Sequence, residues 1–345
     1  DVTRNGDDIP LCVVEDIRRR DLTFKAMYLD PMTDDIFDPH NGKADLKNKR
    51  CVFVGDPIDR ITEDPLRILR FVRFSARFGC EPDSRAVAAI KNSGDAITMV
   101  SPERIGDELT KILTLPNPGD SIMLLVQTRV MQHIIPEVIE MGSGENAQQF
   151  FRYHPEGTVL AHTMWMLNSL REPSAQLAWG VLMHDIAKPR TFAKEADGKI
   201  TNKGHAAVGA EMAEEILKRL KRSNELVDAV VVLVRHHMDF MHIQDMRLNK
   251  VKRMLARKTI DDEIELHRVD CRCSNGDLSN WEWILETRDT LPPEVIKPPR
   301  LITGHDLMEM GIEPGREMGR LLQILEDAQL DGEFEDHEGA VSFAK

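Results

Sequence analysis

The chain has 345 residues and a formal net charge of −13 at pH 7, with 41% hydrophobic and 30% charged residues. This length predicts two or three domains, and the excess of acid excludes a protein covered with nucleic acid over its whole surface. No apolar run approaches membrane-spanning length, no signal peptide is recognisable, and five scattered cysteines argue against a disulfide framework. We therefore expect a cytoplasmic protein without membrane contact.

The first 60 residues predict a small α+β region. Segments 11–14 and 51–54 are short, rich in β-forming residues and bounded by Gly, Asp or Pro, which is typical of strands. Between them we expect a helix near residues 15–28 and a turn-rich stretch over residues 30–45.

The rest of the chain is predicted to be all-α. A helical pattern over 64–78 stops at Gly79, and Ser101-Pro102 begins another helix with a capping serine and a proline at the first helical position. Further helical stretches are broken by Pro, Gly and polar residues: 155–171, 174–187, 204–221, 223–237 and 303–330. We expect a mostly α protein in four parts: 1–60, 61–150, 151–295 and 296–345.

One predicted helix is rich in arginine. Within residues 61–79 the spacings of 3, 3 and 4 place three arginines on one helix face and a fourth at its edge. These four residues are Arg67 at the edge, then Arg70, Arg73 and Arg77. The intervening positions are almost all apolar, so the arginines need anions or acceptors. A salt-bridged surface helix is the alternative, but no acid follows Asp64 until Glu81, which favours anion binding.

Asp64 and Arg67 form a second pattern, a carboxylate acceptor one turn from a guanidinium donor. Cytosine and adenine each offer an amino donor beside a ring acceptor, which matches both groups. Guanine and uracil place a carbonyl opposite the carboxylate and an N–H opposite the arginine. The pair could therefore accept C and A and reject G and U without a template.

Four ordered motifs resemble class II tRNA nucleotidyltransferases and bacterial poly(A) polymerases. They are RRDLT (19–23), VGDP (54–57), EDPLRILR (63–70) and SPER (101–104) with Glu108. The final segment, 301–334, is also similar to the closing segment of that family. The resemblance implies a partial nucleotidyltransferase head, an all-α neck that binds RNA and nucleotide, a further helical domain and a helical tail.

The resemblance also implies roles for single residues. Arg20 and Asp21 would check the ribose, Asp64 and Arg67 would read the base, Arg70 and Arg73 would contact the nucleotide, and Glu63, Glu103 and Arg104 would support them. A carboxylate that merely stabilises a helix N-terminus is the alternative for Glu103.

The polymerase carboxylates of this family, a Gly-rich motif followed by Asp-x-Asp, are not recognisable in the chain. Asp34, Asp35 and Asp38 have the wrong context. Two-metal nucleotidyl transfer needs such carboxylates. We therefore expect them upstream of Asp1, with the Mg²⁺ ligands mostly missing from these 345 residues.

A second set of residues suggests a metal site. Histidine and aspartate from separate helices can hold divalent ions in a bundle core. The order of the set resembles the HD phosphohydrolase superfamily, which implies His162, His184, Asp185 and Asp270 for a first metal and, as extra ligands, His205, His236 and His237. Lys188 would contact phosphate, and the ion would be Mg²⁺, Mn²⁺ or Ni²⁺. A degenerate domain that only binds RNA is the alternative.

These patterns predict an enzyme that adds C and/or A from CTP and ATP to the 3′ end of tRNA, in maturation and repair. An HD-type metal-dependent phosphohydrolase acting on RNA 3′ ends or cyclic nucleotides is the alternative function, and a non-catalytic RNA-binding protein is a third. Which product is made, the metal and the oligomeric state stay open.

Overall fold

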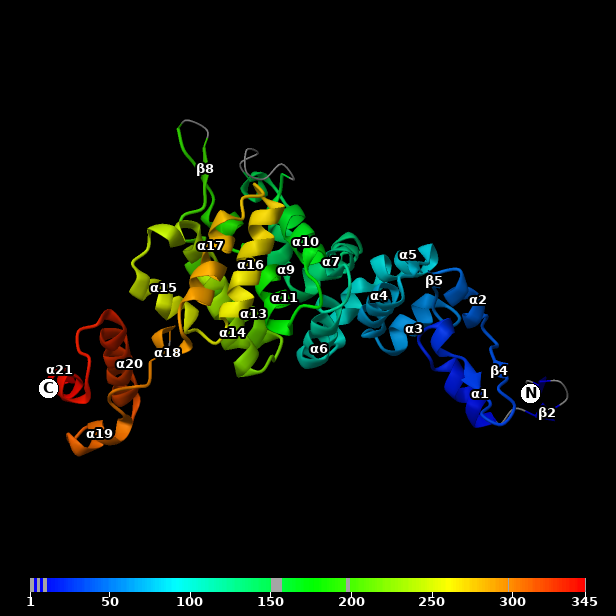
Figure 1. The fold of residues 1–345 in the computed structure, drawn as a ribbon. Coiled ribbons are helices and arrows are strands. Elements are labelled where there is room, and N and C mark those ends of the chain that lie inside the picture. Colours follow the sequence, from blue (N-terminus) through cyan, green and yellow to red (C-terminus); the bar gives the residue numbers. More distant parts are fainter. Residues whose placement is uncertain are drawn as a thin grey trace. The chain divides into compact units, whose positions relative to one another are not determined.

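The computed structural model describes residues 3–4, 7–8, 11–149, 157–196, 199–296 and 298–344. Its described part packs as two compact units. The first comprises residues 1–237 with 269–276, and the second comprises residues 238–268 with 277–345. Both are built almost entirely from helices (Figure 1), as the sequence predicts.

The first unit contains helices α1 to α14, and α16 (Ile260–Cys273) enters it at Val269. Its helices are α1 (Leu11–Arg18), α2 (Gly42–Lys47), α3 (Pro57–Glu63), α4 (Arg67–Phe78), α5 (Ser84–Ser93), α6 (Pro102–Leu113), α7 (Pro118–Gln127), α8 (Met131–Ile134), α9 (Pro136–Glu140), α10 (Val159–Ser169), α11 (Ala175–Met183), α12 (Lys188–Thr191), α13 (His205–Arg219) and α14 (Asn224–His236).

The strands of the described residues are two residues long and pair two by two. Three pairs are antiparallel: β1 (Thr3–Arg4) with β2 (Asp7–Asp8), β3 (Tyr28–Leu29) with β4 (Ile36–Phe37), and β7 (Ala193–Lys194) with β8 (Ile200–Thr201). The pair of β5 (Arg50–Cys51) with β6 (Glu81–Pro82) is parallel.

The predicted strand at 11–14 is wrong, because this segment opens helix α1. Val13 and Ile17, four residues apart, lie on one helix face and pack with Ala26 and Val54 in a small apolar core. Burial of that face overrides the β preference of the two valines. The helix expected near 15–28 ends at Arg18, and the turn-rich stretch contains the β3–β4 hairpin and the start of α2.

The predicted helix over 64–78 begins three residues later than expected. Asp64 has an extended backbone (φ −151°, ψ 100°) and separates α3 from α4, because the residue before a proline avoids the α conformation. The predicted stop is confirmed, since Gly79 has φ 58°, a left-handed value that glycine adopts without strain. The start of α6 at Pro102 is also confirmed, with Ser101 at the N-cap position, but the predicted capping by its side chain is wrong because that side chain makes no capping hydrogen bond.

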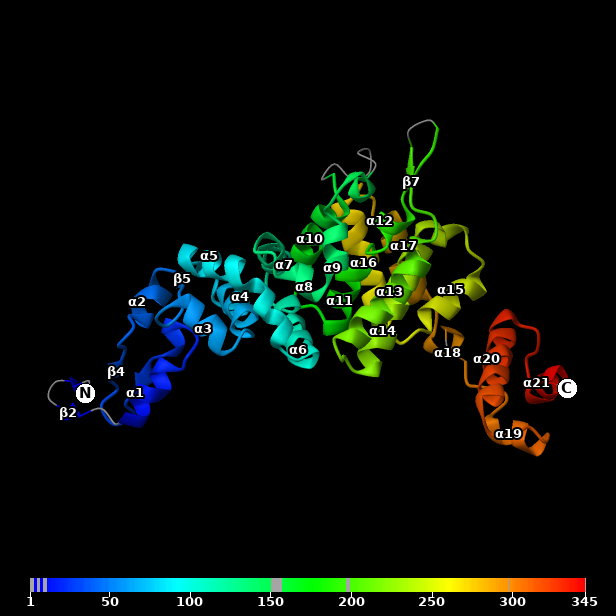
Figure 2. The same ribbon diagram turned by 180° about the vertical axis from the view of Figure 1, so that it is seen from behind.

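Helix α6 lies between α4 and α11, with contacts to both (Figures 1 and 2). At one end, the indole N–H of the fully buried Trp179 on α11 donates to Thr110 Oγ1 at 3.0 Å. In the middle of α6, Asp107 accepts from Arg222, which lies between α13 and α14, at 2.6 Å. These two hydrogen bonds therefore fasten α6 to α11 and to the connection between α13 and α14.

Helices α10, α11, α13 and α14 form the helical core that the sequence predicts. Helix α11 is almost completely buried from Leu177 to Met183. Gly180 permits its close approach to α14, because an added Cβ there would lie 3.2 Å from Leu233 Cβ. The burial of α11 places His184 and Asp185, which follow it directly, inside the unit.

The second unit has two apolar cores, one around Phe240 and Ile284 and one around Leu307 and Leu325. Its helices are α15 (Leu248–Leu255), α17 (Ser279–Thr290), α18 (Pro293–Ile296), α19 (Gly304–Glu309), α20 (Arg316–Asp331) and α21 (His337–Ala344). The predicted unit over 303–330 thus consists of two helices. Throughout the described residues, no helix has the length and apolar character that a membrane span requires. The four-part division stays a prediction.

Candidate nucleotide site and candidate metal centre

Arg70 and Arg73 of α4 are paired with carboxylates from other elements. Arg70 Nε donates to Asp21 Oδ2 at 2.6 Å, and Asp21 is buried. Arg73 Nε lies 2.8 Å from Oε2 of Glu108, which is buried on α6. The alternative of an ion-paired helix is thus realised, but with partners distant in sequence. Nucleotide contact by Arg70 and Arg73 stays a prediction.

Asp64 and Arg67 lie at the neighbouring ends of α3 and α4, and each is held by a predicted supporting residue. Arg104 donates to Asp64 Oδ2 at 3.0 Å. Arg67 donates to Glu63 Oε2 at 2.5 Å and to the carbonyl oxygen of Arg19 at 2.7 Å. The carboxylate and the guanidinium are therefore both oriented before any ligand binds. Glu103 lies exposed in the first turn of α6, where its carbonyl oxygen accepts from a guanidinium nitrogen of Arg222 at 2.8 Å.

Arg20 is held by two residues that the sequence analysis missed. Its Nε donates to Asp16 Oδ2 at 2.8 Å, and a terminal nitrogen donates to the Tyr28 hydroxyl at 3.3 Å. Tyr28 also donates to Asp16. Hydrogen bonds from Tyr28, Arg19 and Arg20 lower the pKa of Asp16. The i, i+4 spacing of Asp16 and Arg20 was a visible signal, whereas Tyr28 comes from the β3–β4 hairpin.

The side chain of Asp38 accepts hydrogen bonds from the backbone of this region. Its two carboxylate oxygens accept from the amides of Gly42 at 2.7 Å and Lys43 at 2.8 Å, at the start of α2. This use as a helix-start acceptor agrees with the expectation that Asp38 is not a polymerase carboxylate.

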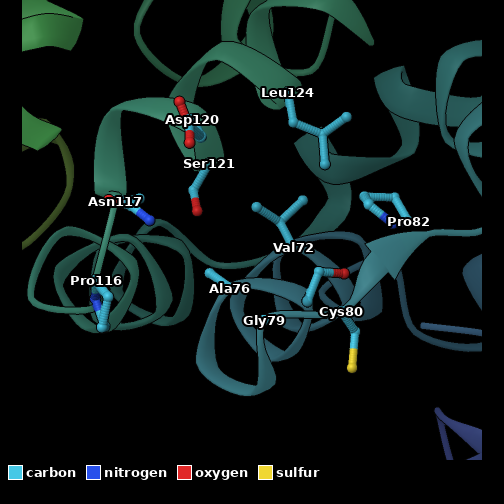
Figure 3. Close-up of a pocket in the computed structure, with 11 residues that line it drawn as sticks. Val72, Ala76, Gly79, Cys80, Pro82, Pro116, Asn117, Asp120, Ser121 and Leu124 are labelled. Atoms are coloured by element: carbon cyan, nitrogen blue, oxygen red, sulfur yellow. The ribbon is translucent and has the colours of Figure 1, made fainter. Parts of the chain in front are cut away.

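A cavity of about 220 Å³ lies between α4 and the start of α7 (Figure 3). Its wall includes Val72, Ala76, Ser121 and Leu124. It occupies the face of α4 opposite to the arginines, and the predicted nucleotide and metal residues do not line it.

The predicted metal residues form two buried groups that share Asp185. In each group the candidate ligand atoms all lie within 4.8 Å of one another. The first group is His162, His184 and Asp185, and the second is Asp185, His205 and His237. They come from α10, the end of α11, the start of α13 and the end of α14, so every ligand but His162 lies at a helix end.

Three of the histidines point one nitrogen at the centre because the other is bonded to the backbone. The Nδ1 atoms lie 2.7–2.8 Å from carbonyl oxygens three residues earlier: His184 to Val181, His205 to Asn202 and His237 to Val234. A carbonyl can only accept, so each Nδ1 carries the proton and each Nε2 presents a lone pair. Such backbone partners are typical of histidines that bind metal.

Two buried acceptor atoms of this centre lack a hydrogen-bond partner in the part of the chain that the structure describes. Among the described residues, His184 Nε2 and Asp185 Oδ1 are buried without a hydrogen-bond partner. His205 Nε2 and His237 Nε2 lie 3.1 Å apart, two acceptors facing each other. A buried unsatisfied polar group costs about 1–3 kcal/mol, so a cation at this place would remove a substantial penalty. The residues therefore fit a divalent metal ion.

The protonation states agree with metal binding. Burial, the largest influence, lowers the pKa of His205 to about 4, so this ring is neutral at pH 7. Burial acts to raise the pKa of Asp185, but His184 and Lys188 oppose it, and the net pKa is well below its usual value. Asp185 is therefore a carboxylate and His205 a neutral ring, the forms that ligate metals.

The structure separates the two adjacent histidines of the VRHHM segment. His237 is buried in the second group, whereas His236 is half-exposed and is not brought into either group. The prediction of His236 as a ligand is therefore not supported by the geometry, because neighbouring helical residues point about 100° apart. Asp270 Oδ1 lies 3.0 Å from His162 Nε2, beside the first group.

Lys188, the predicted phosphate contact, lies beside Asp185, and its phosphate role stays a prediction. Its Nζ is 2.6 Å from Asp185 Oδ2 and donates to Gln149 Oε1 at 2.9 Å. Sequence reasoning missed Gln149, since an isolated glutamine on an irregular segment carries no signal.

Comparison with known proteins agrees with this geometry. Residues 5–52 match the family described as the poly A polymerase head domain, residues 79–141 match the probable RNA and SrmB-binding site of polymerase A, and residues 153–272 match the HD domain. An A-adding tRNA nucleotidyltransferase from Deinococcus radiodurans is 30% identical over 98% of this chain and 80% of its own length. A multifunctional CCA protein from Burkholderia pseudomallei is 31% identical over 70% of this chain and 59% of its own length.

Solved structures share the fold. The Bacillus stearothermophilus CCA-adding enzyme in complex with CTP has a TM-score of 0.63 at 20% identity, covering 94% of this chain and 72% of that one. A CCA-adding enzyme in complex with ATP has a TM-score of 0.53 at 21% identity, covering 96% of this chain and 71% of that one. A nucleotidyltransferase head joined to an HD domain defines a class of RNA-processing enzymes. The chain belongs to the tRNA nucleotidyltransferase and poly(A) polymerase family.

Proposed function

We propose that the complete protein adds C and/or A to the 3′ end of tRNA, with CTP and ATP as substrates. One observation carries the proposal: Asp64 and Arg67 lie at adjoining helix ends and are each held by a separate partner, Arg104 for the carboxylate and Glu63 for the guanidinium. The D. radiodurans relative, named for A addition, supports the same class of reaction.

The proposed selectivity follows from the fixed polarity of these two groups. The Asp64 carboxylate accepts from the amino group of cytosine or adenine, and the Arg67 guanidinium donates to the neighbouring ring nitrogen. Guanine or uracil would place a carbonyl oxygen opposite the Asp64 carboxylate. Two acceptors would then face each other, and neither would have a hydrogen-bond donor. Arg20 would contact the ribose. Mg²⁺ at the Asp-x-Asp carboxylates, which are not among these 345 residues, would supply charge stabilisation at the phosphates.

Base selectivity in the complete protein tests this proposal. Asp64→Ala should relax discrimination of CTP from UTP and of ATP from GTP by about 5- to 150-fold, from the roughly 1–3 kcal/mol that one unpaired buried base contact costs. Asp59→Ala, an exposed carboxylate on α3, is the matched control and should keep wild-type selectivity. A mutant that is slower but equally selective on tRNA lacking its terminus would exclude the base-reading role.

A second function is favoured by the metal centre. We propose that the His/Asp groups bind Mg²⁺, Mn²⁺ or Ni²⁺ and hydrolyse phosphoesters at RNA 3′ ends or in cyclic nucleotides. When bound, such an ion would supply a hydroxide and polarise the phosphoryl group. His162, His184, Asp185, His205, His237 and Asp270 would hold it, and Lys188 would bind a phosphate oxygen. Hydrolysis of 2′,3′-cyclic AMP, assayed with each metal in turn, tests this function independently of nucleotide addition.

We place both reactions in the cytoplasm. All five cysteines are free, which suits a reducing compartment. The partners under this proposal are tRNA, CTP and ATP.

A further inference from the structure

Lys25, which none of the preceding assignments uses, lies beside the arginines of α4. It ends the short 3₁₀ turn Thr23–Lys25, four residues after Asp21. Its Nζ lies 3.9 Å from the ring centroid of Phe74, and Arg73 Cζ lies 4.3 Å from the same centroid. The Phe74 ring is buried, so it serves as a fixed platform for both cations.

The charge of Lys25 is not compensated by this cluster. Three neighbouring arginines each have a carboxylate: Arg20 has Asp16, Arg70 has Asp21 and Arg73 has Glu108. Glu108 is also shared with Lys111. Within the described part of the chain, no carboxylate lies within ion-pair distance of Lys25. The cluster therefore carries an excess positive charge at a half-buried amine.

The electrostatic surroundings of Lys25 agree with this excess. Burial, the largest influence, lowers its pKa, and repulsion from Arg70, Arg73 and Arg20 lowers it further, while Asp21 alone acts to raise it. An anion placed next to Lys25 would relieve both the desolvation and the repulsion.

We infer that Lys25 binds the phosphate chain of the incoming nucleoside triphosphate. The inference rests on the proposed function, because Asp21, Arg70 and Arg73, whose charges act on Lys25, are the residues proposed for the same nucleotide. An ammonium on a flexible stem acts as a compact point charge, which suits phosphate oxygens. The adjacency to Arg20 and Asp21, the proposed ribose contacts, favours the triphosphate over the backbone phosphates of RNA.

Binding measurements with ligands of different charge test the inference. Calorimetric titration of the protein with CTP, CDP, CMP, cytidine and inorganic tripolyphosphate at one salt concentration would compare wild type with Lys25→Met. Methionine keeps an unbranched apolar stem over Phe74, so the fold should persist, as an unchanged melting temperature would verify. We expect the Kd for CTP and tripolyphosphate to rise about tenfold, with a smaller rise for CMP and none for cytidine.

Two further variants sharpen the result. Lys25→Arg should retain most of the affinity for CTP, and Lys47→Met, at an exposed lysine on α2, should change nothing. Equal affinity of wild type and Lys25→Met for CTP would overturn the inference but not the proposed function. The same holds if Lys25→Met binds tRNA more weakly while its affinity for CTP is unchanged. A wild-type protein that binds neither CTP nor ATP would instead overturn the proposed function, and the inference with it.

Discussion

The nucleotide region around α4 and the metal centre beyond α11 are both built from charged side chains, but their charges are balanced in opposite ways. Around α4, Arg70 and Arg73 already have carboxylate partners within the protein. At the metal centre, buried acceptors on His184 and Asp185 have none among the described residues. The first region is therefore organised by its own ion pairs, whereas the second presents buried acceptor atoms that a cation would satisfy. The difference shows that the two regions should respond differently to loss of a single carboxylate.

The largest effect is expected at the metal centre, where Asp185 belongs to both groups. Asp185→Ala should abolish metal binding and reduce phosphoester hydrolysis by more than about 100-fold, since even partners outside the ligand set typically change affinity 10- to 100-fold. Elemental analysis and the 2′,3′-cyclic AMP assay measure the two effects. Glu211→Ala, an exposed carboxylate on α13, is the matched control.

Two further results would bear on this expectation. Nucleotide addition by the complete protein should keep its base selectivity in Asp185→Ala, because Asp64 and Arg67 are untouched. Wild-type protein without bound metal and without activity in Mg²⁺, Mn²⁺ or Ni²⁺ would leave the HD domain as an RNA-binding scaffold and contradict the second proposed function.

A smaller but measurable effect is expected at Glu108, where a carboxylate is lost from an ion pair instead of a metal site. Glu108→Ala leaves the half-buried Arg73 without its carboxylate partner. Breaking a fully buried ion pair typically costs about 3–5 kcal/mol, and the partial exposure of Arg73 places the expected loss at the lower end of this range. Chemical denaturation followed by far-UV circular dichroism would measure the loss. Exposed Glu103, on the same helix, should cost less than about 0.5 kcal/mol when replaced by alanine. Equal stabilities of the two variants would contradict an internally balanced arginine region.

The smallest effect is expected at Tyr28, which helps Asp16 to orient Arg20. Tyr28→Phe removes one hydroxyl and should reduce discrimination of CTP from dCTP by about 2- to 13-fold, as expected for one net hydrogen bond of about 0.5–1.5 kcal/mol. The ratio of kcat/KM for the two nucleotides in the complete protein measures it, because a purely structural role would lower both values equally. Asp34→Asn, at an exposed residue in the turn between the two hairpin strands, is the control.

Sequence reasoning recovered the metal centre more fully than the ion pairs of α4, for a physical reason. Ligands that converge from helix ends keep recognisable short motifs, so His184, Asp185 and His205 could be named in advance. The choice between His236 and His237 could not, because it depends on where α14 ends. Asp21 and Arg70 lie 49 residues apart, and no local pattern joins them.

The wrong prediction of a strand at residues 11–14 has a related cause. The segment 11–14 has strong β propensity, and only the apolar contacts of Val13 and Ile17 with residues later in the chain decide for a helix. Local preference was outweighed by tertiary packing, which a single sequence does not display.

Helix α6 carries Arg104, which holds Asp64, and is fastened to the HD domain through Thr110 and Trp179. The HD domain thereby supports the position of Asp64, the carboxylate proposed to read the base, independently of any chemistry at the metal centre. A related protein that lost the metal ligands would still be under selection to keep the helices of the HD domain that pack on α6. Deleting those helices would expose α6 and would no longer hold Arg104 in position to bind Asp64. Catalytic decay and structural retention can thus proceed separately within one domain, and a relative with an intact α11 but no histidines would be an expected product of evolution.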